Sequence, residues 1–316
     1  MDIIQTELHR HLDVSIRTTT LLELLQENGL EPTSTSLENF KKKLYINKPL
    51  SDLNSVLAQF SLFQKVLNKE ENLERIAFEV IEDCYNEGTK QVELRFAPSF
   101  VCEFNSFSWQ QALEAFDRGR KKALAKWPEM KVGFLLIAAR DYGVDSVHQT
   151  VEFFLKNRKF LLGLDLAGNE VNFPCKLFEK AFEPARKANA NITIHAGEAV
   201  GPENMWEAIE LLGAKRIGHG ISCVKDPKLV EHLREKQICL EMCPTSNWLT
   251  QAVLQLENHP IKRVLESGIP VTINTDDPGI FNVSLPDELK TCKNIIGCSD
   301  SQINQCLGFA AQFTFL

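Results

Sequence analysis

Hydrophobic residues along this chain fall into short apolar runs that alternate with longer segments of helical periodicity. Polar residues or glycines follow the short runs, a pattern that is typical of buried strands. The first run begins at Ile3 and leads to His9 and His11. Seven further strands are expected at 90–97, 131–139, 160–167, 192–195, 216–219, 237–243 and 269–275.

The segments between these runs place apolar residues at helical spacing. Helices are expected at 69–87, 108–126, 144–156, 176–188, 202–212, 227–236, 260–266, 285–296 and 299–311. Strict alternation of strand and helix implies parallel strands with right-handed crossovers. Eight such repeats favour an α/β fold of the closed (β/α)8 TIM barrel type. An open doubly wound sheet is the alternative, although no G-x-G-x-x-G phosphate loop accompanies the early strands.

A long helical insertion separates the first strand from the second. Its helices are expected at 15–28, 36–44 and 52–67. A single domain, 1–316, would therefore carry an insertion at about 15–67. The last of these helices has one apolar stripe, formed by Leu53, Val56, Leu57 and Phe60. Such a stripe is typical of core packing, and it would also suit a lid over a bound ligand.

The composition limits the classes of partner. The chain has 316 residues, a net charge of −7 and a pI near 5.6, whereas binding to a phosphate backbone needs a basic surface. No apolar run reaches the length of a transmembrane helix, and Asp2 and Glu7 interrupt any N-terminal signal sequence. We therefore expect neither a nucleic acid nor a membrane as a partner.

Cysteine usage indicates the redox environment. The nine cysteines are scattered and form no C-x-x-C pair, which fits reduced, mostly buried thiols in a reducing compartment such as the cytoplasm. A thiolate metal site is the alternative that this composition leaves open. Nothing in the sequence specifies an oligomeric state.

Residues that can bind a metal stand at the ends of three expected strands. His9 and His11 end the first strand, and residues two apart in a strand point to the same side. His195 ends the fifth strand, and Asp276 ends the eighth. In a barrel these carboxyl ends meet at one mouth, where function resides. Three imidazoles and a carboxylate suit one divalent ion such as Zn²⁺, which lowers the pKa of a bound water and so generates a nucleophile.

Two further titratable residues stand near these candidate ligands. Glu198 lies three residues beyond His195, where a carboxyl in a closed site can keep its proton and act as a general acid. Alternatively, it interacts with the dipole of the helix at 202–212. His219 ends the sixth strand between two glycines and could act as a base or an electrostatic partner. Its alternative role is simply to occupy a tight turn.

The remaining polar candidates divide into one pair and three isolated histidines. Asp276 and Asp277 would point to opposite faces of a strand, so that one could bind metal and the other could reach a substrate. The same residues also form an Asp-Asp-Pro sequence that is typical of turns. Packing or surface roles are expected for His148, His232 and His259.

Several motifs, taken together and in chain order, resemble those of the adenosine deaminases of the amidohydrolase superfamily. They are His9-x-His11-Leu12-Asp13, Val92-Glu93-Leu94-Arg95, Leu164-Asp165-Leu166-Ala167-Gly168, His195-Ala196-Gly197-Glu198, Ile217-Gly218-His219-Gly220, Cys243-Pro244-Thr245-Ser246-Asn247 and Asn274-Thr275-Asp276-Asp277-Pro278. The resemblance covers most of the chain. It implies a (β/α)8 barrel with one zinc ion that converts adenosine and 2′-deoxyadenosine to inosine, deoxyinosine and ammonia.

The resemblance also implies a role for individual residues. The implied zinc ligands are His9, His11, His195 and Asp276. Glu198 would protonate the purine N1, and His219 would be the base-like histidine. The implied substrate contacts are Asp277 with N7, the backbone N–H of Gly168 with N3, Asp13 with the ribose 5′-hydroxyl, and His11 beside the substrate. The insertion at about 15–67 resembles a flap over the nucleoside.

Three alternative functions remain at this point. Adenine deaminases and N6-methyl-AMP deaminases of the same superfamily share the metal ligands. A carboxylate at Asp13 favours a neutral 5′-hydroxyl, because it would repel a 5′-phosphate. From another class, a catalytically inactive nucleoside-binding or signalling relative would keep the barrel without the reaction. The chemically competent residue at every catalytic position argues against that alternative.

Overall fold

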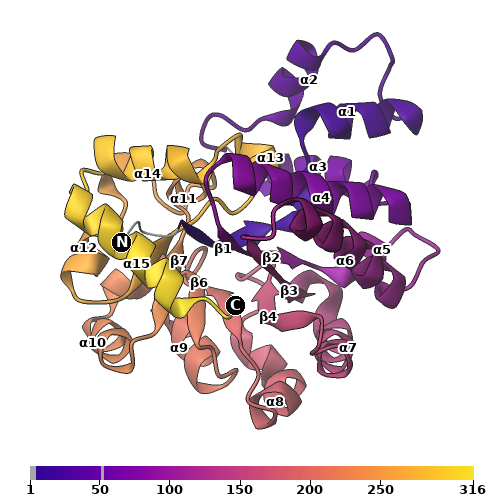
Figure 1. Cartoon of the computed structure of the whole chain (residues 1–316). Coiled ribbons are helices and arrows are strands. Elements are labelled where there is room, and N and C mark those ends of the chain that lie inside the picture. The colour runs from indigo at the N-terminus through magenta and orange to yellow at the C-terminus, as the bar shows by residue number, and fades with distance from the viewer. Residues whose placement is uncertain (1–4, 51–52) are drawn as a thin grey trace.

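The computed structural model describes residues 5–50 and 53–316, with the backbone alone for residues 53–58. Eight strands alternate with helices around a barrel (Figure 1). The strands are β1 (Thr6–His11), β2 (Gln91–Phe96), β3 (Lys131–Ala139), β4 (Leu161–Ala167), β5 (Thr193–Ala196), β6 (Arg216–His219), β7 (Cys239–Met242) and β8 (Val271–Ile273). The longer helices are α1 (Thr18–Glu27), α2 (Leu37–Leu44), α3 (Leu53–Gln64), α4 (Glu70–Asn86), α6 (Trp109–Lys126), α7 (Gly143–Lys156), α8 (Glu179–Lys187), α9 (Pro202–Glu210), α10 (Pro227–Lys236), α12 (Ile261–Glu266), α14 (Leu285–Asn294) and α15 (Asp300–Phe313).

Two parallel four-stranded sheets join edge to edge to close the barrel. Strands β1 to β4 form one sheet in chain order, and β5 to β8 form the other. One junction pairs Leu164 of β4 with Ile192, just before β5. At the other junction, the N–H of His11 donates to the carbonyl of Asp276, and the N–H of Asp276 donates to the carbonyl of His9, each at 2.9 Å. The expected (β/α)8 barrel is thus the fold of this chain.

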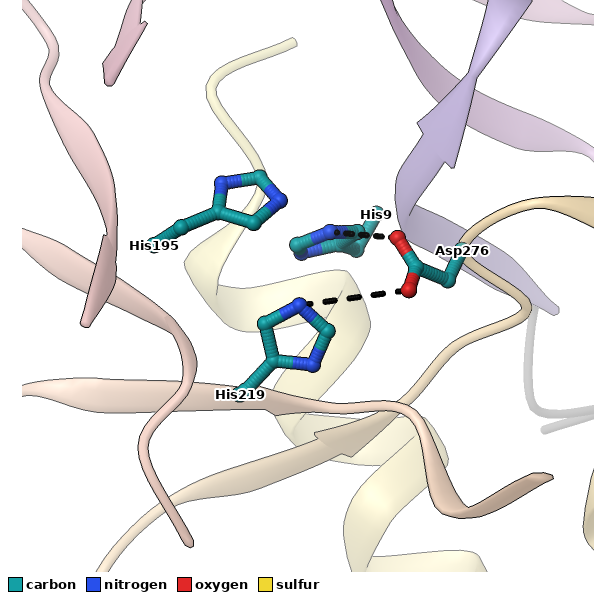
Figure 2. A group of neighbouring side chains, drawn as sticks. All are labelled: His9, His195, His219 and Asp276. Atoms are coloured by element: carbon teal, nitrogen blue, oxygen red, sulfur yellow. Dashed lines mark ion pairs between the residues drawn. The ribbon is translucent and has the colours of Figure 1, made fainter. Parts of the chain in front are cut away.

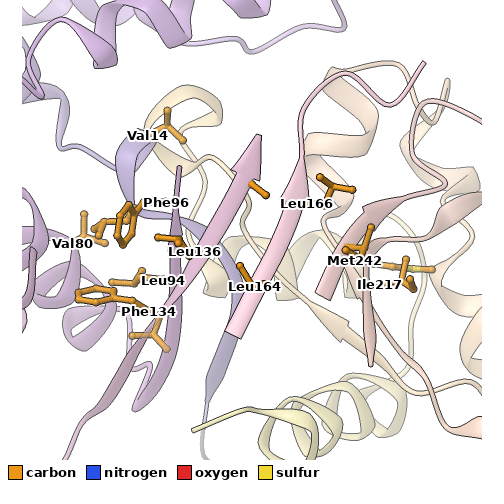
Figure 3. Packing of buried hydrophobic residues seen from close by; sticks show 14 of the residues in the cluster. Val14, Val80, Leu94, Phe96, Phe134, Leu136, Leu164, Leu166, Ile217 and Met242 are labelled. Carbon is orange, nitrogen blue, oxygen red and sulfur yellow. The ribbon is translucent and has the colours of Figure 1, made fainter. Parts of the chain in front are cut away.

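Apolar and charged side chains of the strands point to opposite sides of the sheet. Leu94 and Phe96 of β2 pack beside Phe134 of β3 and Val80 of α4, in the layer between barrel and helices (Figure 3). Arg95, between them in sequence, instead reaches carboxylates on β4 and β7 across the barrel. The hydrophobic core therefore surrounds the barrel, and charged side chains occupy its interior.

The predicted elements lie within a few residues of the observed ones, except for short helices that follow strands. The sequence patterns do not predict α5 (Pro98–Cys102), α11 (Pro244–Leu249) or α13 (Pro278–Phe281), because four to six residues are too few to show a helical period. Each begins with proline, whose fixed φ and missing N–H suit the first helical position. Their signal is therefore a proline shortly after a strand.

The insertion after β1 contains α1, α2 and α3, of which α1 and α2 project beyond the barrel (Figure 1). The N–H of Ile46 donates to the carbonyl of Ile280 in α13 at 3.1 Å, which attaches the insertion to the barrel mouth. In the proposed lid stripe, the side chains of Leu53, Val56 and Leu57 lie outside the described residues. Phe60, the fourth member, is partly buried, and its ring contacts Phe100 edge-on at 6.5 Å.

No helix within 5–50 and 53–316 combines the length and apolar character needed to cross a membrane.

Candidate active site

Three histidines and an aspartate gather at the carboxyl ends of the strands. We call them the ligand cluster, which comprises His9 and His11 of β1, His195 of β5, and Asp276 beyond β8. Nε2 of His11 lies 3.3 Å from Nε2 of His195 and 3.2 Å from Oδ1 of Asp276. Nε2 of His9 lies 3.1 Å from the same oxygen. All four residues that the sequence predicts as ligands therefore point toward one another.

Two overlapping sets of side chains in the described part of the chain could hold a metal ion. One set is His9, His195, His219 and Asp276, which Figure 2 shows. The other is His11, Asp276 and Asp277. Asp276 belongs to both sets, so both surround one point in the barrel mouth. Cysteine takes part in neither set; the nine thiols are free, and eight of them are buried.

The donor atoms of the ligand cluster fit a cation. Nε2 of His9 is buried and makes no well-aligned hydrogen bond, and Oδ1 of Asp276 lies 3.1 Å from it. Burial lowers the pKa of His195 to about 3, so this imidazole is neutral and can offer its lone pair to an ion. Burial also acts on His11, but the carboxylates of Asp277 and Asp276 outweigh it and raise the pKa to about 9. The space between His11, Asp276 and Asp277 therefore attracts positive charge, either a proton or a metal ion.

A set of buried charges lies beneath the ligand cluster. We call it the charge network, and it comprises Glu93, Arg95, Asp165, Arg216 and Glu241. Glu241 lies 2.9 Å from Nδ1 of His9, and Asp165 lies 3.0 Å from Nδ1 of His195. Arg95 joins these two carboxylates, at 2.7 Å from Asp165 and 2.8 Å from Glu241. A carboxylate on Nδ1 fixes the proton there and leaves Nε2 for a metal.

Two carboxylates of the charge network, those of Glu241 and Asp165, remain ionised in spite of their burial. Burial would raise the pKa of Glu241, but Arg95 and Arg216 hold it well below its usual range. His195 and Arg95 overcome the effect of burial on Asp165 in the same way and lower its pKa. The sequence patterns assign no role to these residues. A signal was nonetheless present in Val92-Glu93-Leu94-Arg95, where two charges interrupt an apolar strand.

Glu198 lies beyond β5, and its carboxyl group faces residues of the barrel mouth. Oε2 lies 3.5 Å from Nε2 of His219, and Oε1 accepts a hydrogen bond from Nδ2 of Asn247 at 3.3 Å. Burial raises the pKa of Glu198, which favours the protonated form that a general acid requires. The acidic residue in the first turn of α9 is Glu203. The geometry thus supports the general-acid interpretation over the helix-dipole alternative.

A second glutamate, Glu170, holds the segment that carries Glu198. It is 5% exposed, and its carboxylate accepts the backbone N–H groups of Gly197, Glu198 and Ala199, the last two at 3.1 and 2.9 Å. The side-chain amide of Asn204 also donates to it at 2.7 Å. Glu170 therefore ties the loop after β4 to the loop after β5. The sequence patterns assign it no role, because its partners are backbone groups of another loop.

His219 ends β6 with a left-handed backbone conformation, φ +61°. Its side chain is buried, and Nε2 lies 3.9 Å from Oδ2 of Asp276 (Figure 2). A Cβ at Gly218 would lie 2.9 Å from Cε1 of His9, so glycine is needed where the backbone of β6 approaches the side chain of His9. The tight turn and the position beside the ligand cluster, which the sequence presents as alternatives, are both present.

Three further predicted residues follow strands at the same end of the barrel. Gly168 follows β4 with φ +106°, and a Cβ there would collide with the carboxylate of Asp141. Asp277 is buried, and its Oδ1 has no hydrogen-bond partner. Burial and the neighbouring carboxylate raise the pKa of Asp277 well above its usual range. Asp13 is buried and accepts the backbone N–H of Ala97 at 3.0 Å.

Comparison with known proteins finds relatives that match nearly the full length of this chain. The model of the adenosine deaminase family matches residues 5–316. The adenosine deaminase of Escherichia coli strain SE11 is 38% identical over 311 residues, which is 98% of this chain and 93% of that protein.

Two solved structures are also similar. The N6-methyl-AMP deaminase from Arabidopsis thaliana has a TM-score of 0.83 at 27% identity and covers 99% of this chain and 92% of its own. The adenine deaminase from Arthrobacter aurescens has a TM-score of 0.90 at 23% identity, with coverage of 99% and 94%, and shares the fold. With this match over nearly its full length, the chain belongs to the adenosine deaminase family.

Proposed function

We propose that this chain is a metal-dependent hydrolase that converts adenosine and water to inosine and ammonia. The observation that carries the proposal is the convergence of His9, His11, His195 and Asp276 beside Glu198, a carboxyl whose pKa is raised by burial. Relatives named adenosine deaminase, aligned over 98% of the chain, support the same reaction. We propose 2′-deoxyadenosine as a second substrate.

We propose zinc as the metal. His9, His11 and His195 would hold it through Nε2, and Asp276 would supply the carboxylate oxygen. Three nitrogen ligands and one oxygen ligand suit Zn²⁺, which as a Lewis acid activates water for attack at neutral pH. Glu241 and Asp165, on the Nδ1 atoms of His9 and His195, would keep both rings oriented for this purpose.

The residues of the barrel mouth would bind and activate the purine. Glu198 would donate its proton to N1, which withdraws electrons from C6 and weakens the aromatic resistance to addition of water there. Asp277, protonated because of its raised pKa, would donate a hydrogen bond to N7. The N–H of Gly168 would donate to N3. These contacts would fix the plane of the base with C6 toward the ligand cluster.

Two residues would hold the attacking water, whose oxygen becomes bonded to C6 while the amino group leaves as ammonia. Asp276 and His219 lie 3.9 Å apart and border the same space. Asp276 would accept a hydrogen bond from the water, and His219 would interact with its oxygen. Preorganised partners of this kind reduce the cost of ordering the reactants.

Asp13 would bind the ribose 5′-hydroxyl and select against nucleotides. Its Oδ2 already accepts the N–H of Ala97, so the pocket offers an acidic partner to the sugar. Burial raises the pKa of Asp13, and in its ionised form this carboxylate would repel a 5′-phosphate. N6-methyl-AMP deamination, the activity named for the Arabidopsis neighbour, is therefore the second candidate, and adenine deamination is the third.

We also propose that residues 1–316 form a single domain with the insertion at about 15–67 as a lid over the nucleoside. The hydrogen bond from the N–H of Ile46 to the carbonyl of Ile280 supports this proposal, because Ile280 belongs to the helix that follows Asp277. A closed lid would exclude water other than the reacting one and would strengthen polar contacts inside. The free, mostly buried thiols support a cytoplasmic location.

The deciding experiment compares adenosine, 2′-deoxyadenosine, adenine, AMP and N6-methyl-AMP as substrates of the purified protein, with metal content measured on the same sample. We expect turnover of the two nucleosides, about one zinc per chain, and loss of activity with a chelator that zinc restores. Turnover of the 5′-phosphates alone would refute the assignment to adenosine. An absence of bound divalent metal in an active enzyme would refute the metal-dependent mechanism.

A further inference from the structure

His259, for which the sequence predicts only a packing or surface role, uses both ring nitrogens inside the protein. It is 4% exposed. The backbone N–H of Ile261 donates to Nδ1 at 3.2 Å, and Nε2 lies 3.2 Å from Oδ1 of Asn247. A backbone N–H can only donate, so Nδ1 must accept and carries no proton. The proton of the neutral ring is therefore on Nε2. Burial supports the neutral form by lowering the pKa of His259 to about 3.

This protonation state fixes the orientation of the Asn247 amide. Because Nε2 of His259 is a donor, the atom of Asn247 that faces it must be the oxygen. The amide nitrogen then faces the barrel mouth, where Nδ2 lies 3.0 Å from Nδ1 of His219 and 3.3 Å from Oε1 of Glu198. An amide nitrogen carries two protons and accepts none. Asn247 therefore has one donor for each of these two residues.

We propose that the pair His259–Asn247 holds His219 in the tautomer that carries its proton on Nε2. The Nδ1 of His219 accepts from the Asn247 amide, so a neutral ring must carry its proton on Nε2. That atom is the one that lies 3.5 Å from Oε2 of Glu198 and 3.9 Å from Oδ2 of Asp276. Asn247 and His259 are thus positioning residues, which act through His219 and Glu198 on the proposed reaction.

The tautomer decides between the two overlapping metal sets. Because Nδ1 of His219 accepts from Asn247, the single proton of the neutral ring occupies Nε2 and leaves no lone pair there for a metal, so His219 is excluded from the set that contains it. His11 is left as the third imidazole of the ligand cluster. His219 then faces the attacking water as a hydrogen-bond donor to its oxygen, and Asp276 is the acceptor. This inference rests on the proposed function for its catalytic meaning, although the tautomer itself does not depend on the substrate.

The same amide also orients the acid. Oε1 of Glu198 accepts from Nδ2 of Asn247 at 3.3 Å and lies 3.4 Å from Oγ1 of Thr250, while Oε2 lies 3.5 Å from Nε2 of His219. One side chain therefore contacts both His219 and Glu198 in the barrel mouth. Asn247 lies in α11 and is fully buried, and its amide contacts His259 on one side and His219 and Glu198 on the other, which leaves the side chain little freedom to turn.

Nitrogen NMR of the zinc-loaded protein labelled with ¹⁵N-histidine tests the tautomer directly. Long-range ¹H–¹⁵N correlation spectra distinguish a protonated ring nitrogen from one that accepts or binds metal. We expect Nδ1 of His219 to be unprotonated and Nε2 to be protonated, with the signals assigned by their loss in His219→Asn. A proton on Nδ1, a metal-bound Nε2 or a doubly protonated ring would overturn the proposal.

Two substitutions of His259 test the relay without touching the ligand cluster. His259→Phe leaves the Asn247 amide without its directing donor, so we expect both tautomers of His219 and a kcat about 10- to 100-fold lower, with KM little changed. His259→Gln retains an acceptor and a donor and should restore the single tautomer and most of the kcat. The control is His232→Gln on α10, whose ring packs against Trp206 at 4.9 Å and which should change neither.

Failure of this proposal and failure of the proposed function give different results. If the wild-type protein does not deaminate adenosine, the function is wrong, and the NMR spectrum still reports the tautomer. If the wild-type protein is active and His259→Phe keeps one Nε2-protonated His219 with full kcat, the relay is wrong and the function stands. A melting temperature for each variant separates loss of kcat from loss of folded protein.

Discussion

The ligand cluster and the charge network lie next to each other in the barrel, and they differ in how their charges are satisfied. In the charge network, Arg216 lies 2.6 Å from Glu93 and 2.7 Å from Glu241, while Arg95 contacts both Glu241 and Asp165. Every carboxylate there has an arginine. In the ligand cluster, the Nε2 atoms of His9 and His11 share one carboxylate oxygen of Asp276, and no arginine contacts that carboxylate in the described residues.

This difference indicates which buried polar groups serve stability and which serve function. Buried charges that have partners satisfy the folded protein by themselves. Buried nitrogen and oxygen atoms that converge on one point, as in the ligand cluster, can instead bind a group that the chain itself does not supply, such as a metal ion. The boundary between the two regions runs through His9 and His195, whose Nδ1 atoms belong to one region and whose Nε2 atoms belong to the other.

The largest effect should follow loss of a ligand. His195→Ala removes one of the proposed metal-binding nitrogens, so we expect loss of bound zinc and of detectable turnover, while the fold is retained. Metal analysis, the deaminase assay and circular dichroism measure these three outcomes. His148→Gln, at a half-exposed surface histidine, is the control. A His195→Ala protein that kept its zinc would contradict the distinction between the two regions.

The next largest effect should be a lower rate of the chemical step in a variant that still binds the metal. Glu198→Gln preserves the shape of the side chain and its contact with Asn247 but removes the acidic proton. We expect kcat to fall by about 10²- to 10⁴-fold, the usual contribution of a general acid, with zinc content unchanged. Steady-state kinetics and metal analysis on one preparation test this expectation. Full activity in this variant would mean that another group protonates the purine.

Asp165→Asn tests the boundary between the regions. The amide keeps the size of the side chain but loses the charge that supports Nδ1 of His195. Changes to such partners of a metal ligand typically cost about 10- to 100-fold in metal affinity or activity. Zinc affinity, measured by competition with a chromophoric chelator, should fall within that range. An unchanged zinc affinity would show that Asp165 serves only the stability of the charge network and does not support the ligand cluster.

Glu93→Gln is the matched substitution at the far end of the charge network, and it should have the smallest effect on activity. Glu93 pairs with Arg216 and accepts from Thr314, but it contacts no ligand histidine. We expect unfolding free energy to fall by about 3 kcal/mol, the lower end for a broken buried pair, because Arg216 keeps Glu241. Zinc affinity and kcat below the melting temperature should be unchanged. Denaturant titration measures the free energy of unfolding, and the chelator assay measures zinc affinity. A fall in zinc affinity would show that Glu93 and the ligand cluster are coupled.

Much of the fold was predictable because it depends on local patterns. The strands of this barrel are apolar runs and the long helices are periodic, and both kinds of pattern appear within a single segment of sequence. The short helices α5, α11 and α13 escaped because they have too few residues to show a period. Proline at their first positions was the available signal.

The candidate site divides in the same way. His9, His11, His195 and Asp276 could be predicted because parallel strands bring their carboxyl ends together. Arg95 and Glu241 could not, since their roles depend on which strands face each other across the barrel. Glu170 and His259 were hidden for a further reason, which is that no side-chain pattern reveals their partners. Glu170 accepts backbone N–H groups of the loop after β5, and His259 contacts the backbone N–H of Ile261 and the side chain of Asn247.

The junction between the first and last strands has a consequence for how the site comes into existence. Two backbone hydrogen bonds join His9 and His11, near the start of the chain, to Asp276, near its end. A ribosome must therefore synthesise the chain from β1 to the segment after β8 before the two edges can meet. The proposed metal site is therefore incomplete until both edges have been synthesised, and a bound ion would then join β1 to the segment that follows β8.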